Sequence, residues 1–272
     1  MVCSSKSFDA GIASPVQVAG RVFNDLNANG IMDPDESLIA GATINVVATD
    51  SVGTPVPGGA NERLLSSNGT YSVSLPPGTY TATIVPPTSG DYWLSPLPDE
   101  QVAVGNDFTP NHTTLPVTLL SGDDGLGRFD AGLFEKVSLH TKTFNDANGN
   151  GVRDSDEGGY TGYLIVKLSD ISPNAEGRTE FKWMAENTHD GSVTFPSVKP
   201  GNYQLKFFHL DQSLSFSPQH VGTDDCSDSD VDPESGIVYI TVVGGKDVVC
   251  VSAGIVPGVA VAVDESHDGL VQ

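Results

Sequence analysis

Two twelve-residue stretches place acidic and amide side chains at alternate positions, a spacing suited to binding a hard cation. Calcium is held by such a loop through side chains at positions 1, 3, 5 and 9, a backbone carbonyl at position 7 and a bidentate Glu at position 12, around a Gly at position 6. The sequence therefore predicts calcium ligands at Asp25, Asn27, Asn29, Ile31, Asp33, Glu36, Asp146, Asn148, Asn150, Val152, Asp154 and Glu157. The alternative is a pair of Asx-rich turns with solvated charges.

A third acidic segment occurs near the end of the chain. It places five carboxylates within nine residues, at Asp224, Asp225, Asp228, Asp230 and Asp232. Carboxylates packed this closely against a folded domain repel one another unless a cation lies among them, so these residues are predicted as further metal ligands. The alternative is a flexible acidic loop. The corresponding part of the first half, residues 104–107, is degenerate, so fewer ions are expected there.

Cys3, Cys226 and Cys250 are the three cysteines of the chain. A bridge between Cys226 and Cys250 would close a loop of about 25 residues and would stabilise the fold by roughly 3 kcal/mol in an oxidising compartment. Two buried free thiols are the competing interpretation.

The acidic residues also decide which partners are excluded. The 272 residues include 35 Asp or Glu and 13 Lys or Arg, giving a formal net charge of -22. Nucleic acids and anionic lipids are bound through Lys and Arg, so neither is expected as a partner. No run of about 18 apolar residues is present, so no membrane insertion is expected. The hydrophobic content of 38% is sufficient for a folded core.

Internal repeats show how the chain is organised. Phe23–Gly30 matches Phe144–Gly151, and Pro77–Tyr80 matches Pro200–Tyr203. A closing marker, Phe129–Leu133, recurs as Val251–Ile255. Similar markers near both ends favour an excerpt of a longer tandem array. The predicted boundaries are residues 1–13 (last strand of a preceding module), 14–135 (module 1), 136–256 (module 2) and 257–272 (linker and start of a further module).

Each module is expected to be all-β, because short β-rich runs bounded by turn residues dominate and no helical periodicity is sustained. In module 1 the expected strands are 16–24, 43–48, 70–75, 79–85, 101–104, 115–120 and 128–133. The Pro-Pro-Gly at 76–78 is expected to join two of them as a hairpin. About seven strands in roughly 120 residues favour a β-sandwich, so the calcium loops should connect strands and lack the flanking helices of a calmodulin-type sensor.

Catalysis is not expected. The six histidines show no paired zinc spacing, and neither a Gly-x-Ser-x-Gly elbow nor a phosphate-binding glycine loop is present. The acidic pairs lie in the ion loops, where both carboxylates stay ionised around a metal.

Taken together, these motifs resemble the B-type repeats of serine-aspartate repeat surface proteins, within the Cna-B-like superfamily. The resemblance is carried by the Asp-x-Asn-x-Asn-Gly loop, the Pro-Gly-x-Tyr turn, the Asp-Ser-Asp-x-Asp segment and the closing Asp-Ala-Gly-Leu. It implies tandem Ig-like or prealbumin-like sandwiches with calcium-binding loops, and the same ligand roles as above. Module 1 lacks the second acidic motif and module 2 ends in Ser252 instead of Asp, so neither is a complete copy.

The expected function is a calcium-stabilised spacer in a large extracellular adhesion protein, located at a cell surface or in a secreted matrix. Its partners would be calcium, neighbouring modules of the same chain and an extracellular glycan or protein. One alternative is an adhesive module that binds a glycan or protein through Tyr92 and Trp93, or Phe181 and Trp183. Another is an acidic matrix protein that organises calcium mineral.

Overall fold

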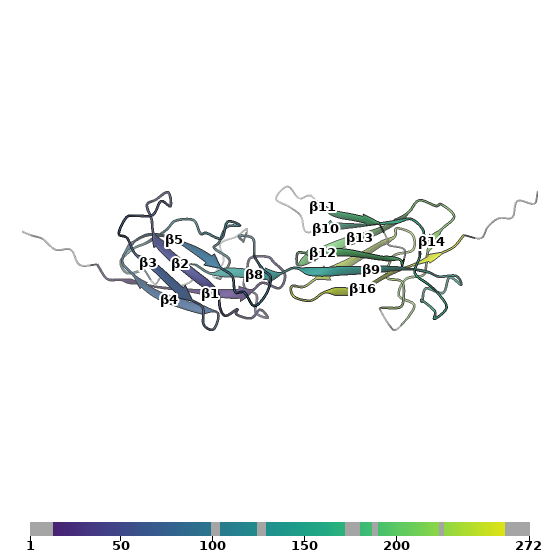
Figure 1. The fold of residues 1–272 in the computed structure, drawn as a ribbon, viewed down its shortest axis with the longest axis horizontal. Helices are drawn as coiled ribbons and strands as arrows, with labels where there is room; N and C mark the ends of the chain where they lie inside the picture. The colour runs from purple at the N-terminus through teal and green to yellow at the C-terminus, as the bar shows by residue number, and fades with distance from the viewer. Residues whose placement is uncertain are drawn as a thin grey trace, which may run out of the picture. The chain divides into compact units, whose positions relative to one another are not determined.

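The computed structural model describes residues 13–98, 104–123, 129–171, 180–186, 190–222 and 226–258. The chain divides into two compact units, one up to Lys136 together with Val243–Gly245, and one from Val137 onward. The described residues form strands, turns and isolated bridges, without a helix (Figure 1). No helix in this part of the chain could therefore cross a membrane. The predicted strand at 101–104 and the predicted module fragments at both ends fall almost entirely outside the described residues.

The first unit is a sandwich of two four-stranded sheets. One sheet has the order β4 (Thr70–Leu75), β1 (Val16–Asn24), β8 (Ala131–Glu135) and β6 (Tyr92–Leu94). The other has the order β3 (Asn61–Leu65), β2 (Thr43–Ala48), β5 (Gly78–Val85) and β7 (Val117–Leu119). Alternating residues of β1, β2 and β5 point inward, and Val18, Ile44 and Ala82 belong to one fully buried cluster. The core therefore lies between the two sheets.

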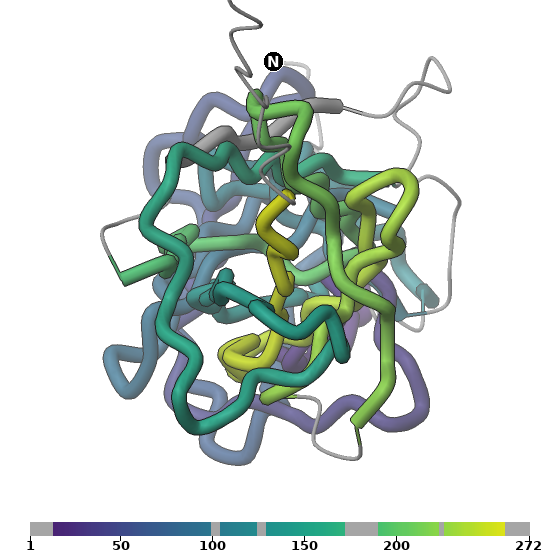
Figure 2. Tube along the Cα trace, turned by 90° about the vertical axis from the view of Figure 1, so that its right-hand side faces the viewer, coloured from purple at the N-terminus to yellow at the C-terminus, as the bar shows by residue number. Residues whose placement is uncertain are grey.

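The second unit repeats this arrangement strand for strand. Its first sheet has the order β12 (Ser192–Val198), β9 (Val137–Asn145), β16 (Val248–Val256) and β14 (Ser215–Phe216). Its second sheet has the order β11 (Glu180–Glu186), β10 (Leu164–Asp170), β13 (Gly201–His209) and β15 (Ile237–Val242). Figure 2 shows the yellow end of β16 in the middle of this unit, as expected for a strand with a partner on each side.

The first and last strands of each unit lie side by side and run parallel. In the first unit Val22 pairs with Ala131 and Asn24 with Leu133. In the second unit β16 pairs with β9 in the same sense. This pairing brings the end of the first strand, where each candidate calcium loop begins, next to the module-closing marker.

The predicted Pro-Pro-Gly hairpin is wrong. β4 pairs with β1, whereas β5 pairs with β2 and β7, so the turn carries the chain from one sheet to the other. Pro76 and Pro77 have no N–H to give to a hairpin ladder. The corner is fastened instead by the Tyr80 hydroxyl, which donates to the Pro76 carbonyl at 2.8 Å, and the Tyr203 hydroxyl does the same to Lys199 at 2.9 Å.

Candidate metal loops

The first loop is closed by the carboxylates at its two ends. Asp25, buried at the end of β1, accepts hydrogen bonds from the backbone N–H groups of Asn29 (3.1 Å) and Gly30 (2.7 Å). Glu36 accepts from the N–H groups of Leu26 (2.8 Å) and Asp33 (3.0 Å). The carboxylate at each end of the twelve-residue loop thus accepts hydrogen bonds from backbone groups inside the loop and holds it closed.

The three intermediate ligand candidates of this loop form one hydrogen-bonded group. Asn27 accepts from the Asn29 N–H at 3.0 Å, and Asn29 accepts from the Ile31 N–H at 2.6 Å. The side-chain amides of both asparagines donate to Asp33 Oδ2, at 2.8 and 3.2 Å. All five predicted side chains of the first loop therefore take part in hydrogen bonds within the loop, to its backbone or to one another.

The second loop closes in the same way. Asp146 accepts from the N–H groups of Asn150 (3.0 Å) and Gly151 (2.8 Å), and Glu157 accepts from those of Ala147 (2.7 Å) and Asp154 (3.0 Å). Both asparagine amides donate to Asp154 Oδ2, at 2.8 and 2.9 Å. Between the predicted ligand positions the two loops share only the Gly at position 6 and the Asp at position 11, and the other four residues differ.

The residue at loop position 7 is fixed by a neighbouring segment. Val152 forms an antiparallel bridge with Asp228, flanked by hydrogen bonds from Arg153 N to Ser227 O (2.7 Å) and from Ser229 N to Gly151 O (2.9 Å). In such a pair the facing residues turn their own N–H and C=O away from the partner segment. The Val152 N–H indeed donates to Asn150 Oδ1 inside the loop at 2.8 Å, so its carbonyl also faces the loop.

The first loop has the same kind of antiparallel bridge at position 7, between Ile31 and Gly105. The flanking bonds run from Met32 N to Val104 O (3.3 Å) and from Asn106 N to Gly30 O (2.8 Å). A backbone carbonyl is thereby offered at position 7 of both loops.

These donor atoms fit a calcium ion in chemistry, because each loop offers three carboxylates, two amide oxygens and one carbonyl, all hard oxygen ligands. Among the described residues, however, no three His, Cys, Asp or Glu side chains lie together as a metal-binding group. The side-chain amides of the asparagines instead donate hydrogen bonds to Asp33 and Asp154. A bound cation would have to displace those amide donors, after which the asparagine oxygens could turn toward it.

The surroundings of Glu36 disfavour its negative charge. Its side chain is buried, and burial raises its pKa to about 7, with the nearby Asp25 and Asp33 adding to the effect. Hydrogen bonds from Asp33 and Leu26 oppose the shift without cancelling it. A divalent cation would favour the ionised form that burial disfavours.

The third acidic segment divides into separate environments. Asp224 and Asp225 lie outside the described residues. Asp228 and Asp230 are buried, and Asp228 Oδ1 has no hydrogen-bond partner. Asp232 accepts from the Ser235 N–H (2.8 Å) and hydroxyl (2.6 Å), and these bonds lower its pKa. Asp232 thus caps a turn, while Asp228 is the residue with unused bonding capacity.

The predicted Cys226–Cys250 disulfide is confirmed, with Cα atoms 4.6 Å apart. The alternative of two free thiols is therefore wrong. Cys3 lies outside the described residues.

The predicted aromatic platform is partly covered. Trp93 is 46% exposed, but the ammonium group of Lys136 lies 3.4 Å from the centre of its ring. This cation–π contact occupies a face on which a sugar would stack. The side chains of Phe181 and Trp183 lie outside the described residues.

Sequence reasoning missed an acidic pair in the first unit, formed by the half-buried Asp107 and the buried Asp130. Asp107 accepts from the Asp130 N–H at 2.7 Å, and Asp130 accepts from the Arg21 N–H at 2.7 Å. In the second unit Asp230 holds the Ser252 N–H in the same way, at 2.7 Å. The signal was the closing marker, which carries Asp130 in one module and Ser252 in the other. Burial, with the charge of Asp107, raises the pKa of Asp130 to about 6.

Asp130→Asn is expected to stabilise the first unit at neutral pH. Since the pKa of Asp130 is about 6 in the folded state, against an ordinary value of 3.8 for an exposed Asp, ionisation weakens the fold as pH rises from about 4 to 6. The variant should be more stable by up to about 3 kcal/mol at pH 7.5 and unchanged at pH 4. Urea unfolding in chelator at both pH values measures the difference. The exposed Asp91→Asn is the charge-matched control, and an equal gain there would contradict the assignment.

Comparisons with known proteins agree with the resemblance found in the sequence. Residues 138–255 match the family described as the SdrD B-like domain. Serine-aspartate repeat-containing protein D of Staphylococcus aureus (strain Newman) is 29% identical over 246 residues, which cover 85% of this chain and 16% of that protein. Serine-aspartate repeat-containing protein F of Staphylococcus epidermidis is 26% identical over 231 residues, covering 83% of this chain and 13% of that protein. The chain thus spans about a sixth of the first relative and about an eighth of the second.

Two solved structures were also matched. The minor pilin GBS52 of Streptococcus agalactiae is 12% identical with a TM-score of 0.29, covering 90% of this chain and 98% of the pilin. The Bacillus anthracis TIE protein is 11% identical with a TM-score of 0.31, covering 89% of this chain and 34% of that chain. The serine-aspartate repeat relatives confirm the prediction of an extracellular, cell-surface or secreted location.

Proposed function

Starting from the match of the second unit to the SdrD B-like domain, we propose that this chain is a non-enzymatic, calcium-stabilised spacer within a larger extracellular adhesion protein. The observation that carries the proposal is the pair of loops with the same closed geometry, at equivalent places in two repeated sandwiches. The repeated units supply length, and the loops supply cation-dependent stability.

Calcium would act by neutralising carboxylates that the fold gathers. Asp25 and Asp146 are fully buried, and Glu36 is nearly so. Without a cation these charges are held by hydrogen bonds from backbone N–H groups of the loops. A divalent ion bound to each loop would offset both the burial cost and the mutual repulsion of the carboxylates. The folded unit therefore gains stability with the logarithm of the calcium concentration once that concentration exceeds the dissociation constant.

The other two functions are less well supported. Lys136 covers the ring of Trp93, which weakens the case for an aromatic glycan platform. A mineral-organising protein needs carboxylates spread over an open face, whereas the loop carboxylates here point inward and accept backbone hydrogen bonds.

Calorimetric titration of the chelator-treated chain with calcium, together with thermal melting, tests the proposal. We expect a small whole number of ions per chain and a higher melting temperature. Extracellular modules bind calcium at about 10⁻⁴–10⁻³ M, so 5 mM calcium should stabilise each site by about 1–2 kcal/mol. Unaltered melting would contradict calcium stabilisation, and dozens of weak sites would favour the mineral alternative.

A further inference from the structure

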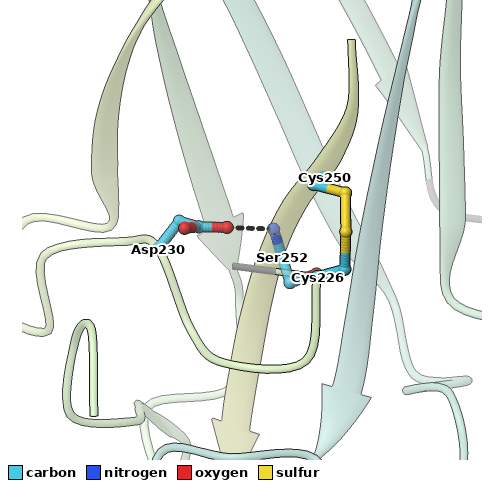
Figure 3. Close-up of a disulfide and its surroundings, with 4 residues drawn as sticks. All are labelled: Cys226, Asp230, Cys250 and Ser252. Atoms are coloured by element: carbon cyan, nitrogen blue, oxygen red, sulfur yellow. Dashed lines mark hydrogen bonds between the residues drawn. A yellow bond between two sulfur atoms is a disulfide. The ribbon is translucent and has the colours of Figure 1, made fainter. Parts of the chain in front are cut away.

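The segment 226–230 is fastened to β16 at both of its ends. Cys226 is joined to Cys250 by the disulfide. Four residues later, Asp230 accepts from the Ser252 N–H at 2.7 Å and donates its own N–H to the Ser252 carbonyl at 2.8 Å. Figure 3 shows the covalent link and the carboxylate contact beside each other on the same strand. The residues between the two attachments have little freedom to move away.

Those intermediate residues form the outer edge of the second calcium loop. Ser227 accepts the Arg153 N–H, and Ser229 donates its N–H to Gly151, so both ends of the Val152 bridge are held by this segment. The Ser229 hydroxyl also accepts from the Gly254 N–H at 3.2 Å. A change in the position of the segment would therefore be felt directly at loop position 7.

Asp228 lies at the centre of the segment, and its carboxylate is held in an unfavourable environment. It is 2% exposed, and its Oδ1 atom has no hydrogen-bond partner. A buried carboxylate oxygen without a partner is unfavourable, so a free segment would turn Asp228 toward water. The two attachments prevent that movement and keep the carboxylate beside the loop.

The first unit has no counterpart of the disulfide or of Asp228, although its Asp107 accepts from the Asp130 N–H as Asp230 does from that of Ser252. Its equivalent segment makes the same backbone bonds to the loop, from Met32 to Val104 and from Asn106 to Gly30. Gly105 occupies the position opposite Ile31, so no carboxylate needs to be held there. The disulfide is found in the unit that has a buried, unpartnered acid to restrain.

We propose that the Cys226–Cys250 disulfide is a clamp that holds Asp228 in position as a cation ligand before the cation arrives. The inference rests on the proposed calcium function and deepens it, because it gives the second unit a preformed ligand that the first unit does not have. The second unit binds calcium with its acidic segment already in place. Breaking the clamp lets Asp228 relax into water, and binding must then draw it back.

A site-resolved calcium titration tests the clamp. The Cys226→Ser/Cys250→Ser chain, Asp228→Asn and the combined variant are compared with the parent by following the amide resonances of Gly151 and Gly30. Removing the disulfide is expected to raise the half-saturation concentration at Gly151 about tenfold and to leave Gly30 unchanged. Asp228→Asn should have a similar effect in the parent and less than about a twofold effect without the disulfide. Equal effects of Asp228→Asn in both backgrounds would overturn the clamp.

A second measurement without calcium separates the clamp from the calcium function. In chelator, loss of the disulfide should speed hydrogen exchange at the Ser229 and Ser252 amides at least about tenfold. The Leu205 amide, in the central strand β13 of the opposite sheet, should be unaffected and reports on general unfolding. Unchanged exchange at Ser229 and Ser252 would refute the clamp. Faster exchange in a chain whose parent binds no calcium would refute the calcium function and the ligand role of Asp228.

Discussion

Gly30→Ala is expected to destabilise the first unit by about 2–5 kcal/mol. Gly30 has φ +80°, a left-handed conformation that costs other residues roughly 1–2 kcal/mol. A Cβ atom there would also lie only 2.3 Å from the Pro96 carbonyl oxygen, and relieving such an overlap costs about another 1–3 kcal/mol. Urea unfolding of the full chain in chelator measures the loss, because the free energy of unfolding then contains no contribution from bound calcium.

Gly58→Ala is the matched control. Gly58 has φ +73°, but an added Cβ would meet no atom within 4 Å. It should therefore show only the conformational cost, roughly 1–2 kcal/mol. If the two variants were equally destabilised, the close approach of Pro96 to the loop would have no energetic weight.

Glu36→Gln is expected to weaken calcium binding at the first loop by on the order of a hundredfold, because it removes a charge and one oxygen from the position-12 ligand. In chelator at pH 8, by contrast, the substitution should not weaken the fold. The carboxylate has a pKa of about 7 through burial, so its ionised form disfavours folding above that pH, and Gln carries no charge. The variant should then be at least as stable as the parent. Thermal melting with and without calcium tests both halves.

Asp35→Asn removes the same charge from the neighbouring, exposed position. We expect less than about a twofold change in its calcium affinity, since surface charges are well screened. If Asp35→Asn weakened binding as much as Glu36→Gln, the general negative charge of the loop would be responsible, and the specific ligand role of Glu36 would fail.

The strands predicted from the sequence were those with a clear inner face. Val16–Asn24, Thr43–Ala48 and Thr70–Leu75 have the predicted bounds because buried and exposed residues alternate along them. The edge strand Asn61–Leu65 was missed because four of its five residues are exposed, so no inner face marks it. Tyr92–Leu94 is only three residues long, too short for a periodic signal. Pairing between strands depends on distant partners, which is why the hairpin assignment failed.

The candidate site was predictable only as far as it is local. Both loops are contained within twelve residues, so their spacing alone brought Asp25 and Glu36 together. The backbone segments that bridge loop position 7 come from residues far along the chain, Gly105 for Ile31 and Asp228 for Val152. The hydrogen bond from the Arg21 N–H to Asp130 depends likewise on the parallel contact between the first and last strands. Neither contact leaves a periodic pattern in the sequence.

That parallel contact has a mechanical consequence. In each unit the chain enters along the first strand and leaves along the last, and the two strands run in the same direction side by side. Tension applied to the ends of a unit therefore pulls β1 against β8, or β9 against β16, along their length. The hydrogen bonds between them are loaded in shear and must break together, whereas a hairpin pulled open would lose them one at a time. Each sandwich is thus built to resist stretching along the chain.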